Sequence, residues 1–193
     1  MGDAAEDRAK ASQLPEGDVI RILLEQHARI RDLFEDVMSA EGEHKSQAFD
    51  ELRALLAVHE TAEELVLRPV TKKTGGDAVA DARNEEESEA NDVLKELEKM
   101  DVNSSEFAAK LAEFQKSVDE HAEAEENDEF PHILSSCDQE QRQTMGKHML
   151  AAEKIAPTHP HPSTAGNIPA QMAVGPFASV VDRTRDAITK AMA

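Results

Sequence analysis

The sequence predicts an all-α protein, an antiparallel up-and-down four-helix bundle with a C-terminal helical extension. Two observations lead to this fold class. The 193 residues include no Trp or Tyr and are rich in Ala, Glu, Leu and Lys, a mixture that favours helix over sheet. Four long segments also carry apolar residues at steps of three and four, and short loops join them, so the helices are expected to pack as antiparallel neighbours around one core.

The first two helices of the bundle follow a polar start. Residues 1–17 are expected to form a flexible N-terminal tail. Asp18 is a good N-cap, and the first helix is predicted over residues 18–40. Ser46 is a plausible N-cap for the second helix, whose apolar stripe runs as far as Val70, and Pro69 followed by Gly75-Gly76 is expected to end it.

The third and fourth helices complete the predicted bundle. The third is expected over residues 78–100, with a first half that is almost wholly polar. Asn103 and Glu106 can form a capping box at the start of the fourth helix, and Pro131 lies near its end. The bundle domain is therefore predicted over residues 18–135.

Three further segments are predicted after the bundle. An additional helix is expected over residues 136–156. A linker rich in Pro and Gly follows at residues 157–176, and an amphipathic C-terminal helix is expected over residues 177–193.

Charge and composition exclude several classes of partner. The formal net charge is -19, from 40 acidic and 21 basic residues, so nucleic acids and anionic membranes would be repelled, whereas cations would be attracted. The single cysteine, Cys137, allows no internal disulfide and suits a reducing cytosol. Neither a signal peptide nor a membrane span is apparent, so a soluble, cytoplasmic protein is expected.

One motif occurs twice, sixty-two residues apart. HETAEELVLRP covers residues 59–69, and HAEAEENDEFP covers residues 121–131. Each has His first, Ala-Glu-Glu at the fourth to sixth positions and Pro at the eleventh. His59 and Glu63 therefore lie one turn apart on the inward face of the second helix, and His121 and Glu125 do so on the fourth.

A fifth polar residue, His27, lies among the apolar residues of the first helix. Burying such groups without partners costs about 2–7 kcal/mol for each neutral group and more for a charge. A metal would compensate, because it binds carboxylates and neutral imidazoles, and carboxylates can bridge two ions. Mixed ligands of this kind suit iron, manganese or zinc, and two irons are favoured over manganese or zinc. The alternative is a metal-free helical interaction module whose polar core is hydrogen-bonded.

These segments resemble the hemerythrin-like family, the HHE cation-binding domain of bacterial type. The matching stretches are LLEQHARIRDLF around His27 and the two repeated motifs, within residues 18–135. The resemblance implies a non-heme diiron centre with an oxo or hydroxo bridge. It also implies that the five inward His and Glu residues are metal ligands and that Glu63 and Glu125 are the bridging carboxylates.

The third helix departs from the family pattern, because it contains no His where relatives have one or two. Glu87 falls at the matching position, and Glu86 is the alternative ligand. A third carboxylate favours ferric iron, which argues against simple reversible oxygen carriage. The second helix has Arg68 where relatives often have an aromatic residue.

The expected function is binding of, or reaction with, a small oxidant (O2, peroxide or NO) for redox response, sensing or iron handling. A catalase-like, peroxide-consuming enzyme is the first alternative, and the metal-free module is the second. The expected partner is the small molecule itself, with no nucleic acid and no membrane. The protein is expected to be a monomer or a weak homo-oligomer.

Overall fold

The computed structural model describes residues 2–154, and every regular element in this range is helical. The elements in chain order are α1 (Ala4–Ser12), α2 (Val19–Ser39), α3 (Gly42–Lys73), α4 (Asp77–Leu97), α5 (Ser105–Ala124), the π-helical segment η1 (Glu125–Glu129), α6 (Phe130–Ser136) and α7 (Gln139–Glu153).

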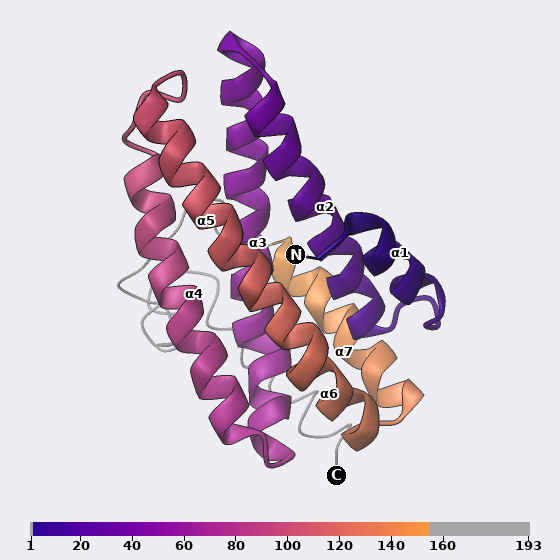
Figure 1. The fold of residues 1–193 in the computed structure, drawn as a ribbon. Helices are drawn as coiled ribbons and strands as arrows, with labels where there is room; N and C mark the ends of the chain where they lie inside the picture. The colour runs from indigo at the N-terminus through magenta and orange to yellow at the C-terminus, as the bar shows by residue number, and fades with distance from the viewer. Residues whose placement is uncertain (1, 155–193) are drawn as a thin grey trace.

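The four long helices α2 to α5 form the bundle. Each packs against the next along the chain, and α2 also contacts α5, which closes the ring (Figure 1). Outside this ring, α1 lies along α2, and α7 packs on both α3 and α2. The predicted all-α four-helix bundle is confirmed.

The apolar core is divided into two parts. One cluster, towards the α2–α3 turn, includes Phe34, Leu52 and Phe114. The other, at the opposite end, includes Leu23 and Val66 and extends to residues of α6 and α7. Since α2 and α3 contribute to both clusters, the buried polar residues between them form a layer across the middle of the bundle.

The N-terminal segment corrects the sequence prediction. Residues 1–17 were expected to form a flexible tail, but Ala4–Ser12 forms α1, capped by the Asp3 side chain. Asp7 is 1% exposed and pairs with Arg31 of α2, and Ala11 is equally buried. Because the helix is held by a buried ion pair rather than by an apolar stripe, hydrophobic periodicity did not reveal it.

Helix α3 begins earlier than predicted and ends just before Gly75-Gly76, where its end was expected. It begins at Gly42 instead of near Ser46, and it passes through Pro69 to Lys73. The residues around the proline, from Leu65 to Val70, are mostly buried, so tertiary packing outweighs the local cost of proline in this helix.

The start and end of α5 also differ in detail from the prediction. Ser104 rather than Asn103 caps the helix, by accepting a hydrogen bond from the Phe107 amide. At the other end, the five π-helical residues of η1 lead directly into α6, with Pro131 in its first turn. π-Helical segments are rare and often occur at functional sites.

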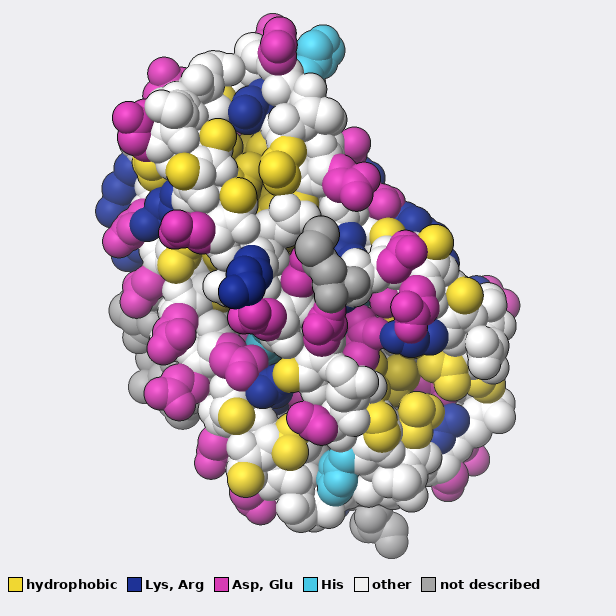
Figure 2. Space-filling model, viewed as in Figure 1, with side chains coloured by type: hydrophobic (Ala, Val, Ile, Leu, Met, Phe, Trp, Pro, Cys, Tyr) yellow, Lys and Arg dark blue, Asp and Glu magenta, His cyan; other side chains and the backbone are white. Residues whose placement is uncertain are grey.

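The structure describes only some of the segments predicted after the bundle. Helix α7 lies within the range predicted for an additional helix and is capped by a capping box of Asp138 and Gln141. The predicted linker and the C-terminal helix, residues 157–193, lie outside the described residues. Within residues 2–154, no helix combines the length and apolar character needed to cross a membrane. Acidic side chains are spread over the visible face of the molecule (Figure 2), in keeping with the net charge of -19.

Candidate metal centre

The six residues singled out from the sequence meet in the polar layer. His27 comes from α2, His59 and Glu63 from α3, Glu87 from α4, His121 from α5, and Glu125 from η1. Each of the four sides of the bundle therefore contributes to the layer. All are buried except His121, whose side chain is 15% exposed.

The six residues form two overlapping groups. His27, His59, Glu63 and Glu125 make up the first, which we call the His27 subsite. Glu63, Glu87, His121 and Glu125 make up the second, the His121 subsite. In each subsite the candidate ligand atoms lie within 4.8 Å of one another. Glu63 and Glu125 belong to both subsites, which is the arrangement that two ions bridged by carboxylates require.

Glu125 faces both subsites with different oxygens. Its Oε2 lies 3.2 Å from His27 Nε2, and its Oε1 lies 3.2 Å from His121 Nε2. On the other shared carboxylate, Glu63 Oε2 lies 3.5 Å from His59 Nε2. The three imidazole Nε2 atoms therefore point to the centre of the layer.

The opposite nitrogen of each imidazole is held by an acceptor. His27 Nδ1 lies 3.2 Å from Glu126 Oε1, His59 Nδ1 lies 2.7 Å from Gln26 Oε1, and His121 Nδ1 lies 2.7 Å from Glu86 Oε2. These acceptors favour the tautomer with the proton on Nδ1, which leaves the Nε2 lone pair free to bind a metal.

Burial and contacts with His121 distinguish the two candidate glutamates of α4. Glu87 is 1% exposed and belongs to the His121 subsite. Glu86 is 40% exposed and contacts His121 from outside, so the structure places it behind a candidate ligand rather than among the ligands.

Several buried atoms of the layer lack hydrogen-bond partners. Glu63 Oε1 and Glu87 Oε2 have none among the described residues, and His27 Nε2 and His121 Nε2 face Glu125 without forming a hydrogen bond. Unsatisfied buried oxygens and imidazole lone pairs are costly, and together they form the donor set of a cation such as iron, manganese or zinc. The residues present therefore fit a metal ion.

Arg68 is a part of the layer that sequence reasoning did not predict. Its side chain is 3% exposed, and its Nη2 donates to Glu87 and, at 2.5 Å, to Glu125 Oε1. Its Nη1 donates to Glu129 Oε2 at 2.5 Å, and Glu129 also accepts from the Thr71 hydroxyl. The available signal was a positive charge inside the otherwise apolar stretch between Leu65 and Val70.

Burial is the largest influence on the pKa values of His59, Glu87 and Glu125, and it is outweighed by neighbouring charges only at Glu125. Burial lowers the pKa of His59 to about 3, so this imidazole is neutral, the form that binds a metal. Burial raises the pKa of Glu87 to about 7, against the opposing effect of Arg68. For Glu125 the effect of burial is outweighed by His121 and Arg68, which hold its pKa well below the usual value.

A cavity of about 290 Å³ lies against the layer, and its lining includes the exposed residues Glu89 of α4 and Ser117 of α5. His27, His59 and His121 line it, and Phe114 and Val93 are among its apolar wall residues. Its lining also includes Glu60, a buried residue whose pKa is raised well above the usual value by burial. A small molecule could thus reach the imidazoles directly.

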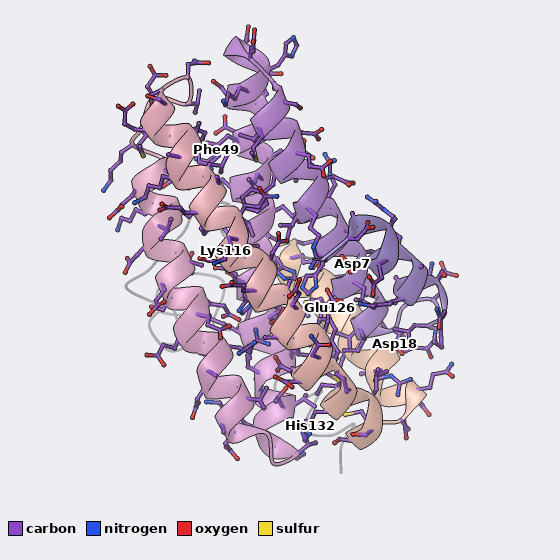
Figure 3. All side chains as sticks on the ribbon, in the orientation of Figure 1. Asp7, Asp18, Phe49, Lys116, Glu126 and His132 are labelled. Atoms are coloured by element: carbon purple, nitrogen blue, oxygen red, sulfur yellow. The ribbon has the colours of Figure 1, made fainter. Side chains whose placement is uncertain are left out.

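A second network, outside the layer, connects α1 with His27. Glu126, which contacts His27, also accepts a hydrogen bond from Lys10 of α1 at 2.9 Å. Arg31 lies 3.5 Å from the same carboxylate and pairs with Asp7. Figure 3 labels Asp7 and Glu126, which lie near each other. Helix α1 therefore helps to position the acceptor behind one candidate ligand.

Comparisons with known proteins agree with the fold and the layer. The sequence profile of the Hemerythrin HHE cation binding domain matches residues 18–133. An uncharacterized hemerythrin-like protein of Schizosaccharomyces pombe is 29% identical over 138 residues, which cover 70% of this chain and 68% of that protein.

A solved structure has the same fold. The crystal structure of a hemerythrin HHE cation binding domain-containing protein from Mycobacterium kansasii aligns with a TM-score of 0.64 and 19% identity, over 86% of this chain and 98% of that chain. With the profile match over more than half of its length, this chain belongs to the hemerythrin HHE cation-binding domain family.

Proposed function

We propose that this chain is a non-heme diiron protein that binds or reacts with a small oxidant, O2, peroxide or NO, for redox response, sensing or iron handling. The observation that carries this proposal is the pair of overlapping subsites that share Glu63 and Glu125. Shared carboxylates of this kind would suit two metal ions about 3.5–4 Å apart, the spacing typical of two-metal sites.

The nature of the ligands favours iron over other metals. Three imidazoles and three carboxylates suit iron, with manganese or zinc as less favoured alternatives, whereas calcium and magnesium prefer oxygen ligands alone. Six side chains do not fill the coordination positions of two irons, so a position is left open for an exogenous ligand.

The chain's own residues would prepare the centre for this ligand. Gln26, Glu86 and Glu126 keep the three imidazoles in the metal-binding orientation through their Nδ1 contacts. The apolar walls of the cavity, including Phe114, admit a small neutral molecule to the imidazole side of the layer. When bound, the irons would supply the electrons or the open coordination that the reaction with an oxidant needs.

A catalase-like enzyme is the second candidate function. The observation that favours it is the cavity, because a path of about 290 Å³ to the three histidines would allow repeated entry of peroxide and release of products. Binding or sensing of an oxidant, the first candidate function, requires only that each iron-loaded protein bind or react with the oxidant once.

One experiment tests both candidates. The protein is loaded with Fe²⁺ without oxygen, and O2, H2O2 and NO are added separately while the absorption spectrum is recorded. We expect new charge-transfer bands with at least one oxidant, and their loss in the His121→Ala variant. The His44→Ala variant is the matched control, because His44 is exposed in the first turn of α3. Rapid O2 release from H2O2 would favour the catalase-like enzyme, and iron-loaded protein that responds to none of the three would contradict the proposal.

A further inference from the structure

The buried Arg68 distinguishes the two subsites. We propose that its guanidinium group competes with metal at the His121 subsite, so that the chain binds a first divalent cation tightly at the His27 subsite and a second one weakly. This inference rests on the proposed function, because it requires that both subsites bind metal.

Within the two subsites, the shortest contacts of Arg68 lie on the side of His121. Its Nη2 donates to Glu87 and to Glu125 Oε1. Its Nη2 also lies 3.5 Å from Oε2 of Glu63, a carboxylate that both subsites share. Glu125 Oε1 is the oxygen that faces His121, whereas Glu125 Oε2 faces His27. Glu87 belongs only to the His121 subsite. The guanidinium group is therefore closest to Glu87 and to the Glu125 oxygen that faces His121, and it lies farther from Glu63, whose Oε2 faces His59.

A metal ion at the His121 subsite needs the same oxygens. A guanidinium group donates N–H bonds to carboxylate lone pairs, and a metal ion binds those lone pairs directly. Two cations on the same carboxylate oxygens also repel each other, and this repulsion is strong in a buried layer. A second ion that uses the oxygens facing His121 therefore displaces Arg68 from Glu87 Oε1 and Glu125 Oε1.

Glu129 gives Arg68 an alternative partner. Its carboxylate is fully buried, lies outside both subsites, and accepts from Arg68 Nη1 at 2.5 Å. The Thr71 hydroxyl, 2.5 Å from the other oxygen, holds this carboxylate in place. A displaced guanidinium group would thus stay paired with Glu129, which avoids the large cost of an unpaired buried charge. Arg68 and Glu129 together make the binding of the second ion reversible and sensitive to metal supply.

The test is a titration of the full-length, chelator-stripped protein with Fe²⁺ under argon, with bound iron measured by elemental analysis after equilibrium dialysis. For the unsubstituted chain we expect two binding constants at least about tenfold apart. Arg68→Met, which removes the charge and keeps an apolar chain of similar length, should tighten the second constant at least about tenfold and change the first much less. Glu129→Gln should do the reverse and weaken the second constant, because Arg68 loses its alternative partner.

Arg53→Met is the matched control, because Arg53 is also a largely buried arginine of α3 but pairs with Glu98 and Asp50, away from both subsites. It should leave both constants unchanged. Titration with Mn²⁺ gives a second readout, since isolated and spin-coupled ions have different electron paramagnetic resonance spectra. At one equivalent, the unsubstituted chain should show isolated ions, and Arg68→Met should show a larger coupled fraction.

Several outcomes would overturn the inference. Equal constants for the two ions in the unsubstituted chain would refute it and leave the proposed function intact. A folded Arg68→Met variant that loses both ions equally would mean that Arg68 only supports the structure. If that variant does not fold, Glu129→Gln decides, and an unchanged second constant refutes the inference. A chain that binds no iron in any form would refute the proposed function as well.

Discussion

Glu126 lies between α1 and the polar layer. Its replacement by Gln tests whether the contacts that it makes with Lys10 and His27 stabilise the fold and support metal binding. The side chain is 8% exposed and contacts His27 and Lys10. Burial opposes its ionised form, but these two contacts outweigh burial and lower its pKa from 4.5 to about 2. A shift of about 2.5 pKa units corresponds to about 3 kcal/mol of stability, at 1.36 kcal/mol per unit.

The sign of the pH dependence follows from the lowered pKa. Since the folded state holds the proton more weakly than the unfolded chain, the stabilisation is fully present above pH 4.5 and is lost as the pH falls through about 2. We expect Glu126→Gln to cost up to about 3 kcal/mol at pH 7 and about half as much near pH 3. The same variant should weaken metal binding about 10–100-fold, because His27 loses its carboxylate acceptor.

The assay is urea unfolding of chelator-treated protein at pH 7, 5 and 3, followed by circular dichroism. Glu120→Gln serves as the control, because Glu120 is exposed and its contact with Lys116 is a surface pair worth little. Equal stability of Glu126→Gln and the unsubstituted protein at all three pH values, with equal metal affinity, would refute the reasoning.

Three more predictions concern packing, capping and metal. Gly146→Ala should destabilise the protein by about 1–3 kcal/mol in urea unfolding, because an added Cβ would clash with the Gly17 carbonyl oxygen. Asp138→Ala should cost about 1 kcal/mol in the same assay, because the α7 N-cap is lost, and an unchanged midpoint would contradict the observed cap. Removing metal with a chelator should lower the melting temperature. Fe²⁺ at 100 times its Kd should restore about 2.7 kcal/mol of unfolding free energy. A melting temperature that changes with neither treatment would count against bound metal.

The bundle and most of the layer could be predicted from the sequence because both depend on helical spacing. Four-residue steps place His59 with Glu63 and His121 with Glu125, and the apolar residues around them show which face is inward. The position of Glu87 followed from the family pattern. Its separation from Glu86 required the structure, because adjacent residues differ by only about 100° around the helix and packing decides which one faces the layer.

The features that were not predicted depend on contacts between residues that lie far apart in the sequence. Arg68 was predicted only as a departure from the family pattern, because its carboxylate partners come from two other elements, α4 and η1, as well as from its own helix. Helix α1 was missed because one buried ion pair holds it, and pairing of Asp7 with Arg31 cannot be read from their positions in the chain. Glu126 and Gln26 are acceptors only because of how neighbouring helices are turned toward each other.

The most direct test of this account is the metal content of the protein after loading with saturating Fe²⁺, measured by elemental analysis, with His59→Ala, His121→Ala and the exposed control His44→Ala treated in parallel. Our account predicts about two irons per chain in the unsubstituted protein and in His44→Ala, with a sharp fall in the other two variants. No bound metal after loading with Fe²⁺, with both layer variants folded and as stable as the unsubstituted protein, would contradict it. The layer would then be a hydrogen-bonded polar core, and the chain would share only the fold of its family.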